Sequence, residues 1–290
     1  MQVLSKQYSK ELKHEINWTN EVAVGVGATE TIYAAINSYV EPEDEVVVFE
    51  PAFDIYSAQV PRSLTSTSQR WRRRFSSKTR AVLLNNPHNP TGKVFAEEEL
   101  ELVAKYVRQY PRVIIISDEV YEHIVFDGKK HVRIASMDGM WERTLTVSSA
   151  GKTFSMTGWK VGWAIGPSNL IKGVCLANNW IQFSVATPLQ EAVANMLDLA
   201  EKPYKEYPTF YAFVADQYKQ KRDRLTCSLV DVGIVPITPG GGIFLYSDIS
   251  AVKVPDSFIQ LNMTHDWPVG AFAFCKTDEA IKRLAKLRDS

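Results

Sequence analysis

Two lysines stand among hydroxyl-bearing residues and glycines between residues 148 and 160, directly after an apolar run. One amine, Lys152 or Lys160, can attack an aldehyde as a nucleophile, while the other clamps an anion beside the hydroxyl of Ser149. A molecule with both an aldehyde and a phosphate would use both lysines, and pyridoxal phosphate is such a molecule. Taken alone, a segment of this kind is usually a solvated surface loop.

A carboxylate and a phenol, Asp118 and Tyr121, follow another apolar run and lie three residues apart. An aspartate that faces a pyridine nitrogen keeps it protonated, which makes the ring an electron sink. A tyrosine hydroxyl can bond the phenolic oxygen of the same ring. The alternative for Asp118 is a helix N-cap.

Three further segments carry weaker signals, each also after an apolar run. A glycine-containing turn before Ala28 and Thr29 leads into an expected helix, whose N-terminal N–H groups can receive a phosphate. Phe53 can stack on a flat ring or belong to the core. Asn89 stands between two prolines that can aim its amide into a site, or the loop is a plain turn.

Short β-branched runs alternate with longer amphipathic segments along the chain. Strands are expected at residues 22–24, 45–49, 81–84, 113–116 and 144–147, and helices at residues 29–39 and 96–108. This alternation predicts an α/β fold with a largely parallel sheet, followed from about residue 187 by helix and a smaller C-terminal α+β part. Ligands of such sheets gather at the carboxyl ends of the strands, where the candidate residues stand.

The composition is that of a globular protein with a sizeable core: 290 residues, 45% hydrophobic, and no net charge. Balanced charge argues against nucleic-acid and membrane partners, and we interpret the basic run at residues 70–74 as a solvated loop. The three cysteines lack metal or disulfide spacing, and no apolar leader or membrane span is apparent. We therefore expect a cytoplasmic protein without a bound metal.

Four motifs occur together in this order: NPHNPTG at 86–92, DEVY at 118–121, MDGMWERT at 137–144 and SAGKTFSMTGWKVGW at 149–163. With them the chain resembles the fold-type I pyridoxal-phosphate aminotransferases, specifically the kynurenine aminotransferase and cysteine-conjugate β-lyase group. The resemblance extends from about residue 4 to about residue 250. It implies a large α/β domain over residues 1–200 and a reduced small domain over residues 201–290.

The resemblance also implies a role for each candidate residue. Lys152 would bind the cofactor covalently, Asp118 would face the pyridine nitrogen, and Phe53 would stack on the ring. Asn89 and Tyr121 would bond the phenolic oxygen. The phosphate would be held by Ala28 and Thr29 through N–H groups and by Ser149 and Lys160 through side chains. The implied assembly is a homodimer, and the implied substrates are an amino acid (kynurenine-like, glutamine or aromatic) and a 2-oxo acid.

Three departures from the family pattern leave alternatives open. The chain begins inside the pattern, without the arm that covers the substrate, and the stretch at residues 60–80 is short. Ala271 stands where the family has an arginine that grips the substrate carboxylate. A charge-assisted pair of this kind contributes roughly 2–4 kcal/mol. The alternatives to transamination are therefore β-elimination from a cysteine conjugate, or a catalytically impaired relative that acts through a partner.

Overall fold

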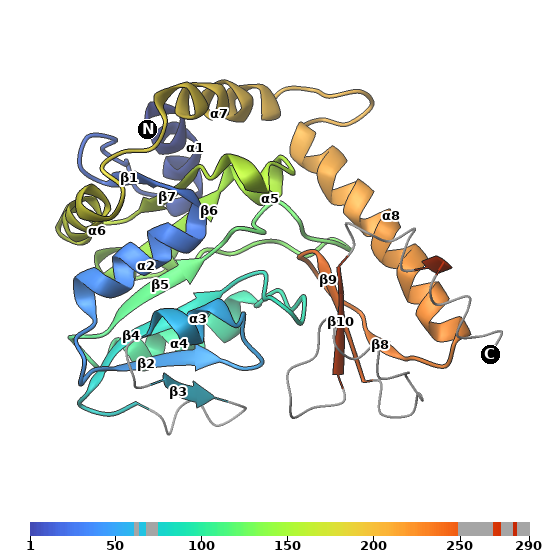
Figure 1. The fold of residues 1–290 in the computed structure, drawn as a ribbon, viewed down its shortest axis with the longest axis horizontal. Coiled ribbons are helices and arrows are strands. Elements are labelled where there is room, and N and C mark those ends of the chain that lie inside the picture. The colour runs from blue at the N-terminus through green and yellow to red at the C-terminus, as the bar shows by residue number, and fades with distance from the viewer. Residues whose placement is uncertain (61–63, 68–74, 249–268, 274–280, 283–290) are drawn as a thin grey trace.

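The centre of the molecule is a seven-stranded sheet in the order β1-β7-β6-β5-β4-β2-β3 (Figure 1). The computed structural model describes residues 1–60, 64–67, 75–248, 269–273 and 281–282. β7 runs antiparallel to β6 and β1, and the other neighbouring strands are parallel, which confirms the predicted α/β fold. The strands are β1 (Val22–Gly25), β2 (Glu45–Phe49), β3 (Leu64–Thr67), β4 (Thr79–Asn85), β5 (Ile114–Asp118), β6 (Thr144–Ser149) and β7 (Gly162–Ile165).

Sequence patterns account for five of these strands but not for β3 and β7. β3 has the sequence LTST, with three hydroxyl-bearing residues in place of an apolar run. β7 has the sequence GWAI and follows a glycine-rich segment, so it resembles the end of a loop. Both strands are short and are defined by the neighbours that they pair with rather than by their own composition.

Helices cover both faces of the sheet, which explains why its strands are continuously apolar. On β2, β4 and β5, alternate side chains contact α2 (Gly27–Tyr39) and α6 (Ser168–Ile181) on one face, and α4 (Glu97–Val107) on the other. For example, Ile116 packs on the first face and Ile115 on the second. The remaining helices are α1 (Gln2–Leu12), α3 (Ile55–Gln59), α5 (Ala150–Thr153), α7 (Thr187–Ala200) and α8 (Phe210–Asp231), with short 3₁₀ turns at Ile134–Ser136, Trp141–Arg143 and Thr157–Trp159.

A second, antiparallel sheet of three strands lies beside α8 (Figure 1). Its strands are β8 (Pro236–Ile237), β9 (Phe244–Asp248) and β10 (Val269–Ala273). Leu225 and Leu229 of α8 share a core with Leu245 of β9 and with the segment that follows β5. Ala271 lies on β10 opposite Tyr246 of β9. The division of the chain into domains near residue 200 stays a prediction.

A buried ionic cluster connects α1 with the segment that follows β5. The guanidinium of Arg133 is 4% exposed and pairs with Glu119, Glu122 and Glu11 of α1. Tyr8 of α1 also donates from its hydroxyl to Glu122 at 2.7 Å. Burial raises the pKa of Glu122, but Arg133, His123 and the hydrogen bond from Ser148 together bring that pKa down to about 2. The cluster therefore remains charged inside the protein.

Some sequence predictions concern residues that the structure does not describe. The basic run at residues 70–74 and Cys275 are outside the described residues. Cys175 and Cys227 are exposed free thiols. In the described parts of the chain, no helix has the length and apolar character needed to cross a membrane.

We predict that Arg133→Ala destabilises the protein by about 3–5 kcal/mol, because it leaves two buried carboxylates without their cation. The matched control is Arg108→Ala, which removes a partly exposed pair with Glu101 and is expected to cost about 0–1 kcal/mol. Urea unfolding at pH 7 measures both differences. Similar losses for the two variants would contradict the importance of the buried cluster.

Candidate active site

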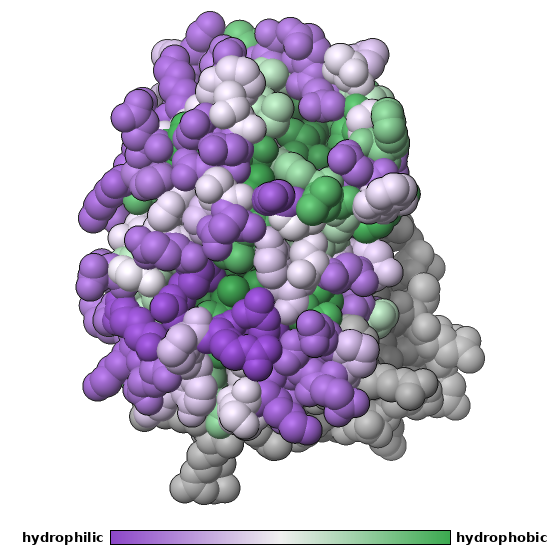
Figure 2. Space-filling view, turned by 90° about the vertical axis from the view of Figure 1, so that its left-hand side faces the viewer, coloured by the Kyte–Doolittle hydropathy of each residue, from purple (hydrophilic) through white to green (hydrophobic). Residues whose placement is uncertain are grey.

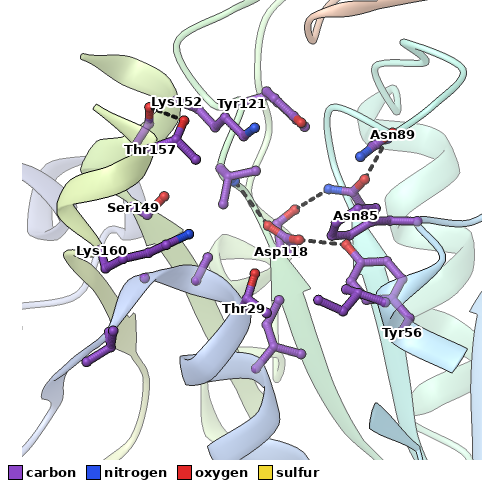
Figure 3. Close-up of a pocket in the computed structure, with 18 of the residues that line it drawn as sticks. Thr29, Tyr56, Asn85, Asn89, Asp118, Tyr121, Ser149, Lys152, Thr157 and Lys160 are labelled. Carbon is purple, nitrogen blue, oxygen red and sulfur yellow. Dashed lines mark hydrogen bonds between the residues drawn. The ribbon is translucent and has the colours of Figure 1, made fainter. Parts of the chain in front are cut away.

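A cavity of about 270 Å³ opens at the carboxyl ends of β4, β5 and β6. The polar side chains there converge from several segments of the chain (Figure 3). The nine residues that the sequence predicts for the site all line this cavity: Ala28, Thr29, Phe53, Asn89, Asp118, Tyr121, Ser149, Lys152 and Lys160. The structure therefore brings together residues that are up to 132 positions apart, from 28 to 160.

The sheet register explains this convergence. Asn85, the last residue of β4, pairs with Asp118, the last residue of β5, and Asp118 pairs with Val147 of β6. Parallel strands end at the same edge, so the residues that follow them are neighbours. The last residue of β6 is Ser149, and α5 with Lys152 begins directly after it.

Asp118 is a buried carboxylate, 5% exposed, at the centre of the site (Figure 3). Its Oδ2 accepts a hydrogen bond from the Tyr56 hydroxyl at 2.6 Å, and its Oδ1 accepts one from the Val120 N–H at 3.2 Å. Burial raises the pKa of Asp118 to about 6, although both hydrogen bonds act in the opposite direction. The carboxylate is thus ionised at neutral pH at a cost to folding.

Lys152 and Tyr121 approach each other from different segments. The Nζ of Lys152 lies 5.9 Å from the centroid of the Tyr121 ring. Tyr121 is 3% exposed, so the cavity presents its phenol in a mostly dry environment. Thr157, which also lines the cavity, donates to the Gly151 carbonyl at 3.3 Å and so connects the 3₁₀ turn to α5. The Lys152 amine and the Tyr121 phenol therefore both line the cavity.

One end of the cavity has the donors that an anion requires. α2 begins at Gly27, and its first residues line the cavity, so its N–H groups and positive dipole end face it. Lys160, in the left-handed conformation (φ 54°), lies beside Gly27. A Cβ on Gly162 would come within 2.5 Å of the Gly27 backbone, so glycine is required where β7 packs against the start of α2. Together with Ser149, these groups can hold a phosphate.

The loop from residue 86 to residue 92 is fixed at both of its sides. On one side, the Asn89 N–H donates to Oδ1 of Asn85 at 2.6 Å, and the Asn85 amide donates to the Asp118 carbonyl at 2.9 Å. On the other, the Gly92 carbonyl accepts N–H groups from Gly240 and Gly241 at 2.8 and 3.0 Å. Asn89 lies on the cavity wall (Figure 3), and its role in a site stays a prediction.

Several residues of the cavity wall are absent from the sequence prediction, notably Tyr56, Asn85, Thr157 and Phe244. Asn85 could have been found from its place at the end of an expected strand. Tyr56 follows Phe53 by three residues, a spacing that places both on one side of a helical turn. Phe244 had no local signal, because only tertiary packing brings β9 to the cavity.

Comparison with known proteins shows similarity along nearly the whole chain. The family model "Aminotransferase class I and II" matches residues 3–280. A kynurenine–oxoglutarate transaminase of Dictyostelium discoideum is 42% identical over 283 residues, covering 88% of this chain and 64% of the relative. Human kynurenine–oxoglutarate transaminase 3 is 37% identical, covering 99% of this chain and 71% of the relative. The chain thus spans about two thirds of the length of these curated relatives.

Solved structures of related proteins have the same fold. An N-succinyldiaminopimelate aminotransferase from Mycobacterium tuberculosis superposes with a TM-score of 0.88 and is 34% identical, covering 99% of this chain and 82% of that one. An Escherichia coli protein described as having a methionine aminotransferase function, YbdL, also has a TM-score of 0.88, at 29% identity, and covers 100% of this chain and 82% of that one.

We predict that Asp118→Asn stabilises the cofactor-free protein at pH 8 by about 2–3 kcal/mol. The folded-state pKa of about 6 is above the ordinary 3.8, so the unfavourable contribution of Asp118 is complete above pH 6. It declines as the pH falls and is absent below pH 3.8. Urea unfolding at pH 8 and at low pH measures the change.

The control for this prediction is Asp127→Asn, at an exposed carboxylate whose pKa is lowered mainly by its hydrogen bond from Arg222. Asp127→Asn is expected to be less stable than the parent at pH 8, whereas Asp118→Asn is expected to be more stable. A loss of stability in Asp118→Asn at pH 8 would show that the buried carboxylate is not held at a cost.

Proposed function

The chain belongs to the class I and II aminotransferase family, and from this premise we propose that it is a pyridoxal-phosphate-dependent aminotransferase. The proposed reaction moves an amino group between a kynurenine-like, glutamine or aromatic amino acid and a 2-oxo acid. One observation carries the proposal: the amine of Lys152, the carboxylate of Asp118 and the N-terminus of α2 face one cavity. The names of the curated relatives support kynurenine and oxoglutarate as the first substrates to test.

The residues of the cavity fit the three chemical parts of pyridoxal phosphate. The N-terminus of α2, Ser149 and Lys160 would hold the phosphate. Phe53 would lie against the ring, and Asn89 and Tyr121 would bond its phenolic oxygen. Lys152 would react with the aldehyde. When bound, the cofactor supplies a ring that accepts the electrons released from the substrate Cα–H bond.

The protein's own groups then perform proton transfer and orientation. In its neutral form, Lys152 can accept the substrate Cα proton at Nζ and donate it again, which is the acid–base step that amino-group transfer requires. An ionised Asp118 stabilises positive charge on the ring nitrogen. The Tyr121 phenol and the enclosing wall limit the water that reaches these groups.

Recognition of the substrate carboxylate is the point on which the alternatives differ. Position 271, where the resemblance implies an arginine, carries alanine on β10. Among the described residues that line the cavity, the cations are Lys152 and Lys160. This favours, as a second candidate, a relative that binds the cofactor but turns over amino acids slowly. The proposal of full activity requires another group to bind the carboxylate.

We expect added pyridoxal phosphate to form a covalent, borohydride-stable adduct on Lys152, detected by its visible spectrum and by peptide mass spectrometry. Lys152→Ala should abolish the adduct, whereas Lys160→Ala should retain it with weaker cofactor binding. Kynurenine or glutamine with 2-oxoglutarate should then be converted at an ordinary turnover of about 1–10³ per second. An adduct on another lysine would refute the site. An adduct with negligible turnover would favour the second candidate.

We further propose that the protein is a homodimer that covers the exposed end of α6. Trp180 and Phe183 are 89% and 83% exposed, with Leu176 and Ile181 nearby in sequence. Large apolar side chains gathered at one place on a surface are typical of an interface. Figure 2 shows the side of the molecule on which α6 lies, where apolar side chains are exposed among polar ones.

The double variant Trp180→Ser with Phe183→Ser is expected to shift the protein from dimer toward monomer, because it removes two large apolar contacts. Sedimentation velocity across a concentration series measures the shift. Val235→Ser is the control, because Val235 is 74% exposed and far from α6 in sequence. Unchanged sedimentation of the double variant would exclude this end of α6 from the interface.

A further inference from the structure

Tyr56 is a buried residue of the cavity wall to which the proposed reaction gives no role. It is 2% exposed and belongs to the short helix α3, which follows β2. Its ring packs edge-on against Phe53, with centroids 5.6 Å apart and planes at 86°. The segment that places Phe53 on the cavity wall therefore also places the Tyr56 phenol there (Figure 3).

The hydroxyl of Tyr56 has a charged partner. It donates to Oδ2 of Asp118 at 2.6 Å, a distance typical of a strong O–H···O⁻ hydrogen bond. Both residues are buried, so water competes less for this hydrogen bond than for an exposed one, which makes it stronger. A phenylalanine would fill nearly the same volume, so packing alone does not require the hydroxyl.

We propose that Tyr56 is a positioning residue that holds the Asp118 carboxylate in one orientation and keeps it ionised for the cofactor ring. This inference rests on the proposed pyridoxal-phosphate site. With Oδ2 held by Tyr56 and Oδ1 held by the Val120 N–H, rotation of the carboxylate is restricted at both oxygens. The carboxylate still lines the cavity, where each oxygen retains capacity to accept another hydrogen bond.

The groups around Asp118 act on its charge in opposite directions. Burial and the neighbouring Glu119 raise its pKa. The Tyr56 hydroxyl, the Val120 N–H and the Lys152 ammonium lower it. Tyr56 is the strongest of these opposing groups, so loss of its hydroxyl would raise the Asp118 pKa further. A protonated Asp118 cannot stabilise a cationic ring nitrogen by charge.

The reciprocal effect on Tyr56 agrees with this arrangement. Burial raises the pKa of the Tyr56 phenol well above its ordinary value, and the Asp118 charge raises it further. The phenol therefore keeps its proton and remains a donor at neutral pH. Its role is electrostatic and geometric, and it does not exchange a proton with the substrate.

The chain contains a matched control in Tyr8. Its hydroxyl is also buried and donates to a buried carboxylate, Glu122, at 2.7 Å. Neither Tyr8 nor Glu122 is among the described residues that line the cavity. Tyr56→Phe and Tyr8→Phe therefore remove the same kind of hydrogen bond, one inside the site and one outside it.

The first measurement is the carboxyl pKa of Asp118 in the cofactor-free protein, by carbon-13 NMR of labelled aspartate with the signal assigned through Asp118→Asn. Tyr56→Phe is expected to raise this pKa by about one unit or more, because a donor to the charged form is lost. Tyr8→Phe is expected to leave it unchanged. An Asp118 pKa in Tyr56→Phe equal to that of the parent would overturn the inference and leave Tyr56 as a packing residue.

The second measurement is the dissociation constant of pyridoxal phosphate between pH 5.5 and pH 8.5. In Tyr56→Phe, the pH below which affinity declines should move upward with the Asp118 pKa, so that affinity near pH 6 is about fivefold weaker or more, while affinity at pH 8.5 changes little. A uniform loss at every pH would mean that Tyr56 acts through packing and would contradict the inference. Failure of the parent to bind pyridoxal phosphate would instead overturn the proposed function, since the NMR measurement does not involve the cofactor.

Discussion

Parallel pairing of β4, β5 and β6 is the constraint on which the site depends. It requires the three strands to end at one edge, so the residues that follow them share a small space. Packing on both faces by α2, α6 and α4 opposes a change of register, because a shift of one residue would move every side chain to the opposite face, where it would have to pack against a different helix. The positions of Asp118 and Ser149 are therefore consequences of core packing.

The same packing makes the centre of the site unfavourable for a charge. Asp118 lies at the end of an apolar strand, where burial opposes its ionisation. Among the described residues, none forms a salt bridge with Asp118, whereas Arg133 pairs with Glu122. The two hydrogen bonds to the Asp118 carboxylate come from neutral donors, the Tyr56 hydroxyl and a backbone N–H. A buried carboxylate of this kind costs stability when it is ionised, and strongly perturbed groups of this kind are typical of functional sites.

Elements distant in sequence hold the loops of the site in place. Gly162 of β7 allows close contact with the start of α2, which positions the N–H groups that face the cavity. Gly240 and Gly241, before β9, bind the carbonyl of Gly92 and so support the loop that carries Asn89. The Arg133 cluster connects α1 to the segment that includes Tyr121. Each support joins an irregular segment to a rigid element, which reduces the freedom of the side chains at the cavity.

The sequence by itself determined the α/β class and five strands of the large sheet, and it selected nine residues that line one cavity, because apolar runs and specific motifs are local signals. β3 and β7 depended on the tertiary structure. β3 consists mainly of hydroxyl-bearing residues and β7 begins with glycine, so neither has a strand signal of its own, and each is defined by the strands that it pairs with. Phe244 reached the cavity through the packing of the second sheet. The link between Tyr56 and Asp118 was also invisible in the sequence, because 62 residues separate them and no residue pattern reports a hydrogen bond made across the fold.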